Sequence, residues 1–271
     1  MRHLLLALLL LVTLSAKERI VSLSPSITEI VYGLGSGAEL VATSSYSLYP
    51  GAAKKLPIVG SYVHPNIEKV LSFSPSLVIG ESFNAPVLQK LHYFHIKTLK
   101  VKLKTIDDIT KSIVKIAQTL HKTQTANKLI TTIKKAIQDA PKTKKPHSVL
   151  IVYGLHEDLR SGIYVAGEDI FFNDIIKLTG NTNAYKESAI SQPVLGYENV
   201  IALNPQQIII LHSHATEPNV NVKKALTHWY ALPTTAAKNH KISIVDEDYL
   251  HIPSQRVVLT IKRLSREMQD D

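Results

Sequence analysis

The chain has 271 residues, 45% of them hydrophobic and 20% charged, so it can bury a large core of ordinary globular composition. It has no cysteine, which excludes thiol catalysis, thiolate metal sites and a lipid anchor attached through cysteine. The formal net charge is +9, but no aromatic RNA-binding motif accompanies the basic stretches. A solvated basic face is the simplest explanation, so we expect no nucleic-acid partner, and an anionic surface, an anionic ligand or nucleic acid is the alternative.

The first residues predict a secretory signal peptide. Met1-Arg2-His3 precede an apolar run from Leu4 to Val12 that is too short to span a bilayer, and small residues follow up to Ala16. We therefore expect a signal peptide over residues 1–16, a mature start near Lys17 and a periplasmic protein that is not a lipoprotein. An uncleaved anchor or a buried N-terminal helix is the alternative.

Residues 17–104 predict a first α/β lobe. Short strands that are almost continuously apolar alternate with helical segments, which is typical of a parallel sheet covered by helices. The expected strands are 20–23, 39–43, 77–80 and 96–99, and the expected helices are 28–34, 65–71 and 85–93.

Residues 105–145 predict connecting helices rather than a further strand. Apolar residues recur with helical spacing, and the polar run from His121 to Thr125 divides the stretch into two helices. A lysine-rich turn from Pro141 to Pro146 ends it.

Residues 146–271 predict a second lobe with the same alternation. The expected strands are 148–153, 208–211 and 242–245, and the expected helices are 169–179, 198–203, 222–228 and 255–268. The fold class is therefore α/β, with two Rossmann-like lobes that have mainly parallel sheets and are joined by a long backbone helix.

An internal repeat indicates that the two lobes are related. Residues 67–80 align without a gap on residues 197–210, and each segment contains a glutamate near a helix start, a proline turn and a buried strand. Glu68 and Glu198 thus occupy the same place in two units. The alternative is that any α/β protein reuses such a helix–proline–strand pattern.

Enzymatic motifs are absent from the sequence. It contains no nucleophile elbow, no phosphate-binding loop, no dinucleotide glycine fingerprint and no His-Glu-x-x-His. We therefore expect a protein that is not an enzyme and that has no resident cofactor.

The histidines allow a metal hypothesis that we do not adopt. His212 and His214 directly follow a strand and could join His64, His251 or Glu217. Two histidines two residues apart in a loop are weak support, so surface or hydrogen-bonding histidines are the simpler interpretation and we assign no metal site.

Several tyrosines fall in predicted loops at strand ends. A tyrosine combines a flat apolar face with a polar tip, which suits a ring-bearing or chelate ligand in a cleft. For each one, packing at the edge of a loop is the alternative. These residues are Tyr46, Tyr49, Tyr62, Tyr164, Tyr197 and Tyr249.

Three stretches carry a resemblance to a known family. They are Arg19–Glu29, Ser44–Pro50 with Lys55–Gly60, and Asn66–Val70 with Pro75–Ile79. The chain resembles the helical-backbone (class III) periplasmic solute-binding proteins of ABC importers, which serve cobalamin, iron-siderophore and haem uptake, over roughly residues 19–265. The Ser44–Pro50 stretch is most similar to the cobalamin-binding members.

The resemblance implies two lobes joined by one long helix, little hinge closure and a monomer. It also implies that one glutamate on each lobe docks onto an ABC permease dimer at the inner membrane, and Glu68 and Glu198 match those positions. A helix-start carboxylate favoured by the helix dipole is the alternative explanation for both.

The resemblance further implies a ligand cleft. Its expected lining is Tyr46, Tyr62, Glu81, Tyr164, Gln192, Asp248 and Tyr249. Tyr46 is kept from the cobalamin pattern, Tyr62 and Tyr164 replace other aromatic residues, and Glu81 and Gln192 replace tryptophans. Ile252 stands where an arginine is expected near Asp248.

The cleft should therefore be more polar than a cobalamin pocket. We expect a corrinoid ligand, with an iron-siderophore, haem or another metal chelate as the alternative. A periplasmic enzyme or adaptor that has kept the fold and lost transport is a third possibility.

Overall fold

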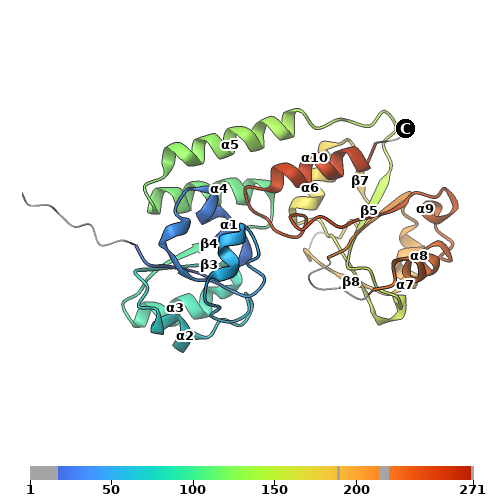
Figure 1. Ribbon diagram of the computed structural model, residues 1–271. Coiled ribbons are helices and arrows are strands. Elements are labelled where there is room, and N and C mark those ends of the chain that lie inside the picture. Colours follow the sequence, from blue (N-terminus) through green and yellow to red (C-terminus); the bar gives the residue numbers. More distant parts are fainter. Residues whose placement is uncertain (1–17, 188–189, 214–219, 270–271) are drawn as a thin grey trace, which may run out of the picture.

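The computed structural model describes residues 18–187, 190–213 and 220–269 and has two lobes that lie side by side beneath a layer of helices (Figure 1). The segment expected to be a signal peptide lies outside the described residues. None of the helices in the described ranges combines the length and apolar character needed to cross a bilayer.

The N-terminal lobe contains a parallel sheet of four short strands in the order β2-β1-β3-β4. The strands are β1 (Ile20–Ser22), β2 (Leu40–Ala42), β3 (Leu77–Glu81) and β4 (Lys97–Val101). Its helices are α1 (Pro25–Gly33), α2 (Ile67–Ser72) and α3 (Ala85–Tyr93). The helix starts follow from local chemistry, because Ser24 caps α1 through its side chain and Asn66 caps α2 in the same way.

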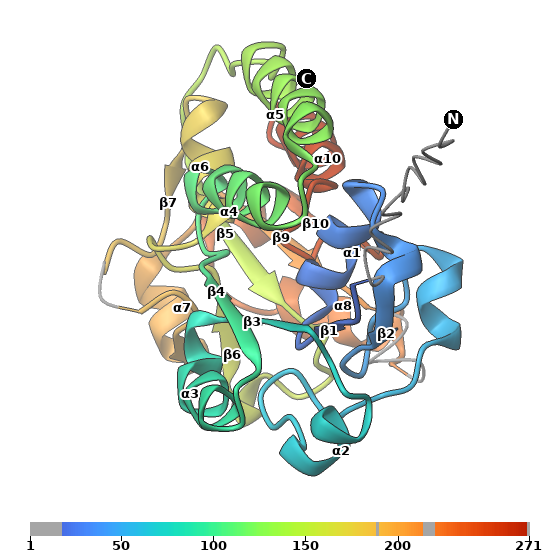
Figure 2. The same ribbon diagram turned by 90° about the vertical axis from the view of Figure 1, so that its left-hand side faces the viewer.

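Two helices connect the lobes: α4 (Ile106–Thr119) and α5 (Thr123–Gln138). Thr105 and Asp108 form a capping box at the start of α4, and His121 has a positive φ of 56° where the chain turns between the helices. Helix α5 lies over α4 on the side away from α2 and α3 (Figure 2). The predicted break between two helices is therefore confirmed, and α5 is the long helix that leads to the second lobe.

The C-terminal lobe contains a second sheet in the order β10-β9-β5-β6-β8, with β7 also paired to β5. Its parallel centre is β5 (Ser148–Tyr153), β9 (Gln207–Leu211) and β10 (Ile242–Val245). The short strands β6 (Ile163–Val165) and β8 (Val194–Leu195) run antiparallel, and β7 (Thr182–Asn183) is parallel to β5. The helices are α6 (Phe171–Leu178), α7 (Tyr197–Leu203), α8 (Val222–Tyr230), α9 (Thr235–Lys238) and α10 (Val257–Glu267).

The two segments of the proposed internal repeat occupy corresponding places in the two sheets. In the first lobe β3 lies between β1 and β4, and in the second lobe β9 lies between β5 and β10. Helices α2 and α7 precede β3 and β9 at the aligned positions, so each repeat unit is a helix that leads into an inner strand next to an edge strand of its sheet. The fold class is the one predicted.

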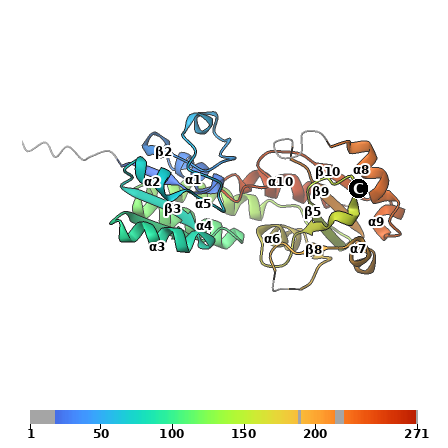
Figure 3. The ribbon, with the colours of Figure 1, turned by 90° about the horizontal axis from the view of Figure 1, so that it is seen from below.

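A continuous apolar core joins the lobes. One cluster of buried side chains includes Ile20 and Ile79 from the first sheet, Ile151 and Ile209 from the second, and residues of α4, α5, α6 and α10, among them Ile261. Seen from below, α10 lies between the two lobes (Figure 3). Because these side chains are shared, the relative placement of the lobes depends on core packing and not on a flexible linker.

Candidate functional site at the carboxyl ends of the two sheets

The predicted ligand residues gather where the parallel strands of both lobes end. Tyr46 follows β2, Glu81 is the last residue of β3, and Asp248 follows β10. Tyr164 lies in β6 and is paired with Tyr153, the last residue of β5. Tyr164 was expected in a loop, and this expectation is wrong because two antiparallel strands too short to show a periodic pattern carry it. Carboxyl ends of open α/β sheets are the usual ligand side.

The first group of aromatic residues lies on the N-terminal lobe. The Tyr62 ring contacts that of Phe83 edge to face, with ring centroids 6.0 Å apart, and both side chains are about half exposed. Buried Asn84 positions this pair, because its Nδ2 donates to the Tyr62 carbonyl at 2.9 Å and its Oδ1 accepts the Glu81 amide at 2.9 Å. The turn that carries Tyr62 is therefore tied to the end of β3.

The loop that carries Tyr46 is held by buried hydroxyl groups. The Thr28 hydroxyl of α1 lies 2.5 Å from that of Thr43, which donates to Ser47 at 2.8 Å. Tyr46 itself has a φ of 63° and is exposed, although its neighbour Ser47 is buried. The hydroxyl network thus fixes the backbone on both sides of an outward-facing tyrosine.

An exposed aromatic residue and an exposed apolar residue of the C-terminal lobe lie on the short strands β6 and β8. Tyr164 pairs with Val194 across β6 and β8, and both side chains are about half exposed. Gln192 precedes β8 and is exposed. Burial raises the pKa of the hydroxyl of Tyr153, the cross-strand partner of Tyr164, and a hydrogen bond with the Gln192 side chain opposes this shift. The Tyr153 ring packs against that of Phe172, with 5.6 Å between the ring centroids. Exposed apolar faces therefore exist on both lobes.

Arg256 connects the two lobes. It lies next to the start of α10, and its guanidinium donates to both carboxylate oxygens of Glu29 on α1, at 2.9 Å from Nε and 2.5 Å from Nη2. The Glu29 carboxylate also accepts from the Ser254 hydroxyl at 2.5 Å. The Arg256 side chain is 10% exposed and that of Glu29 only 3%, so this ion pair is buried.

The same arginine organises predicted site residues. Its Nη1 lies 3.2 Å from the Asp248 carboxylate, and its guanidinium carbon lies 3.9 Å from the centroid of the Tyr49 ring and 5.9 Å from that of Tyr249. Ile252 still stands where the resemblance implies an arginine, and Arg256 is the arginine that contacts Asp248. Sequence reasoning missed both Arg256 and Glu29, because their contact spans 227 positions.

Burial dominates the electrostatics of Glu29. Desolvation raises its pKa, and hydrogen bonds from Arg256 and Ser254 oppose that shift without reversing it. The contact also brings the segments close elsewhere, since a Cβ on Gly33 of α1 would come within 2.9 Å of the Gln255 side chain. The end of α1 thus packs directly against the segment that carries Arg256.

Glu81 is the second acidic residue of the site with a shifted pKa. Burial raises its pKa, and a hydrogen bond with the Ser24 side chain opposes the shift. A carboxyl group therefore lies, partly buried, at the end of the inner strand β3 of the N-terminal lobe.

We expect Glu81→Gln to stabilise the protein near neutral pH by on the order of 1 kcal/mol. The folded state holds the Glu81 proton to a higher pH than the unfolded chain, so wild-type stability falls as pH rises through the raised pKa. Urea unfolding should show a difference between variant and wild type that shrinks as pH falls to about 4. A difference that is constant with pH would contradict the assignment.

Glu68 and Glu198 are exposed and are each the second residue of their helix, α2 and α7. Both helices lie on the lower side of the molecule in Figure 1, away from α5. Near Glu198, its carboxylate raises the pKa of the Tyr197 hydroxyl through a hydrogen bond. The two carboxylates are therefore accessible, one on each lobe.

The histidines do not assemble a metal centre in the described part of the chain. Within residues 18–187, 190–213 and 220–269, no group of three or more His, Cys, Asp or Glu side chains is arranged to hold a metal ion. His214 and Glu217, which belonged to the metal hypothesis, lie outside the described residues.

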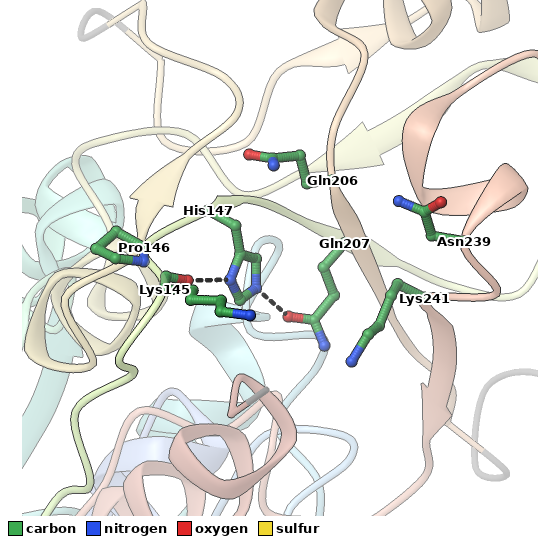
Figure 4. A pocket seen from close by; sticks show the side chains of 7 residues that line it. All are labelled: Lys145, Pro146, His147, Gln206, Gln207, Asn239 and Lys241. Carbon is green, nitrogen blue, oxygen red and sulfur yellow. Dashed lines mark hydrogen bonds between the residues drawn. The ribbon is translucent and has the colours of Figure 1, made fainter. Parts of the chain in front are cut away.

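A pocket of about 210 Å³ lies at the opposite end of the second sheet (Figure 4). It is lined by Lys145, Pro146, His147, Gln206, Gln207, Asn239 and Lys241. His147 contacts the Lys145 carbonyl at 3.1 Å and the Gln207 side-chain oxygen at 2.9 Å. These residues precede or begin β5, β9 and β10, so the pocket is separate from the site at the carboxyl ends.

Comparison with known proteins agrees with the two-lobe fold. The sequence model described as "periplasmic binding protein" matches residues 20–249. A vitamin B12-binding protein of Yersinia pestis (strain Pestoides F) is 26% identical over 269 residues, which cover 97% of this chain and 91% of that protein.

Two solved structures have a similar fold. A periplasmic heme-binding protein of Roseiflexus sp. RS-1 in apo form superposes with a TM-score of 0.78 at 26% identity and covers 93% of this chain and 97% of that one. A periplasmic vitamin B12-binding protein of Vibrio cholerae superposes with a TM-score of 0.71 at 24% identity and covers 92% and 96%.

Proposed function

Because the chain belongs to the periplasmic binding protein family, we propose that it captures a corrinoid between its two lobes and delivers it to an ABC importer of the inner membrane. The observation that carries the proposal is the pair of exposed aromatic faces, Tyr62 with Phe83 on one lobe and Tyr164 on the other, at the ligand side of both sheets. The family binds solutes and does not convert them, so no catalytic group is assigned.

A corrinoid is the first candidate for two reasons. The relative named for vitamin B12 binding aligns over almost the whole chain, and the stretch from Ser44 to Pro50 resembles the cobalamin-binding pattern. In this proposal the ligand contacts Tyr46, Tyr62, Glu81, Tyr164, Gln192, Asp248 and Tyr249, and we add Tyr49 and Phe83 from their contacts.

Haem or another iron chelate is the second candidate. The specific observation that favours it is the superposition on a heme-binding protein at 26% identity. Exposed tyrosine hydroxyls near the strand ends, such as that of Tyr46, are oxygen donors that suit ferric iron.

The proposal includes the remaining parts of the transport role. Residues 1–16 would direct export and be removed, and residues 17–104 and 146–271 would form the lobes on either side of the helices of 105–145. Exposed Glu68 and Glu198 would dock onto the permease, one through each lobe. Transport energy would come from the ATPase of the importer.

Ligand titration tests the function directly. We expect cyanocobalamin or cobinamide to bind with a Kd of about 1 μM or tighter, measured by calorimetry and by quenching of tyrosine and tryptophan fluorescence. Haemin titrated in parallel tests the second candidate through its absorption spectrum. Binding of haemin alone would replace the corrinoid by haem, and no binding of any of the three at high micromolar concentration would reject both.

A further inference from the structure

The site offers acidic groups to a ligand. Asp248 is 67% exposed, so one face of its carboxylate is available even though it pairs with Arg256. Glu81 lies at the end of β3 beside Ser24, and Asn84 links its backbone to that of the aromatic residue Tyr62. Both lobes therefore present a carboxyl group next to an aromatic surface.

The cation at the site is already neutralised. Arg256 contacts Tyr49 and Asp248, but its side chain is only 10% exposed and its guanidinium already donates to the carboxylates of Glu29 and Asp248. The two carboxylates of Glu29 and Asp248 therefore balance or exceed the single positive charge of Arg256, and Glu81 at the end of β3 adds a carboxyl group on the N-terminal lobe. A ligand would thus meet the exposed carboxylate of Asp248 and the end of β3 at Glu81, but no unpaired positive charge from Arg256.

The nearest cluster of lysines is also largely engaged. It surrounds a pocket of about 300 Å³ beside Ser82, formed by β4 and α4. Lys102 pairs with Asp108 at 3.1 Å, Lys111 pairs with Asp107 at 2.6 Å, and the Lys115 ammonium donates to the Lys100 carbonyl at 2.8 Å. The ammonium contacts given above belong to Lys102, Lys111 and Lys115, so we use Lys100 to test whether this cluster contributes to ligand binding.

The groups at the edge of the ligand should suit a site that offers carboxyl groups and few unpaired cations. A group that carries carboxylates would be desolvated against Glu81 and Asp248, and like charges at close range suppress binding. Neutral N–H donors instead form charge-assisted hydrogen bonds with the same oxygens. We propose that the site selects a ring-shaped metal chelate whose periphery carries neutral hydrogen-bond donors, such as primary amides, and discriminates against the same ring with carboxylates.

This selectivity inference rests on the proposed function. One pair of probes shows whether a failure lies in the selectivity or in corrinoid binding itself. Dicyanocobinamide and dicyanocobyrinic acid share the corrin ring and cobalt, but the first carries amide side chains and the second carries carboxylic acids. We expect the amide form to bind at least about tenfold more tightly near neutral pH and low salt. Calorimetric titration of the mature protein gives both constants.

Variants locate the selectivity. Glu81→Gln keeps the size of the side chain and should reduce the preference for the amide form several-fold, chiefly by improving binding of the acid form. Asp139→Asn, at the end of α5, is the matched control and should leave the ratio of the two constants unchanged. Lys100→Ala should also leave it unchanged.

Each outcome has one meaning. If neither corrinoid binds, the corrinoid assignment of the proposed function fails. If both bind but the acid form binds equally or more tightly, or if Lys100→Ala abolishes binding of the acid form alone, the selectivity inference is overturned and the proposed function stands. An unchanged ratio in Glu81→Gln would likewise overturn the selectivity inference.

Discussion

Replacing Arg256 by alanine should lower the free energy of unfolding by about 3–5 kcal/mol, the largest effect that we expect from one substitution. The change leaves the Glu29 carboxylate buried without its cation, since its side chain is only 3% exposed. It also removes the guanidinium that covers the Tyr49 ring. Urea unfolding followed by circular dichroism near neutral pH measures the loss.

Two comparisons make the result specific. Arg160→Ala removes an exposed pair with Asp158 and should cost less than about 1 kcal/mol. Combining Arg256→Ala with Glu29→Gln should recover part of the lost stability, because the buried charge is gone. If Arg256→Ala costs no more than Arg160→Ala, the ion pair does not hold the two lobes together.

Reversing both proposed docking charges, Glu68→Arg with Glu198→Arg, should reduce ligand uptake on the order of 100-fold or more. Both carboxylates are exposed at helix starts, so neither supports the core, and each reversal turns an attraction for a basic permease surface into a repulsion. The measurement is uptake by cells of the source organism in which the variant replaces the native protein.

Ligand affinity and the midpoint of thermal unfolding should stay close to wild type in that variant. The matched control is Asp107→Arg with Asp139→Arg, which reverses two exposed carboxylates near α4 and α5, on the other side of the molecule. This control should leave uptake intact. Normal uptake by the Glu68 and Glu198 variant would show that the docking surface lies elsewhere.

The two expectations describe different parts of one mechanism. The Arg256 junction and the apolar core that runs through α4, α5, α6 and α10 restrict the motion of one lobe against the other. Such a core would hold α2 and α7, which carry the two proposed docking glutamates, at a nearly constant separation. We therefore expect recognition by the importer to depend on fixed geometry more than on large closure.

Periodicity was sufficient where elements are long or repeated. The helix expected over residues 85–93 has those bounds, and the isoleucine spacing from Ile106 to Ile116 marks the buried face of α4. It was insufficient for β6, β7 and β8, which have two or three residues each and owe their existence to pairing with β5 or with each other. Pairing of that kind depends on partners that local pattern does not reveal.

The sequence by itself determined the class of fold, the order of the main elements, the repeat and the two exposed glutamates, because these follow from local periodicity, capping residues and similarity along the chain. Tertiary structure alone decided how the site is charged. Arg256 reaches Glu29 from 227 positions away. The site therefore contains a cation that local sequence did not reveal, and the carboxylates of Glu29 and Asp248 balance its charge. Burial, which sets the pKa of Glu29 and Glu81, is likewise a property of the folded chain and not of either residue's neighbours in sequence.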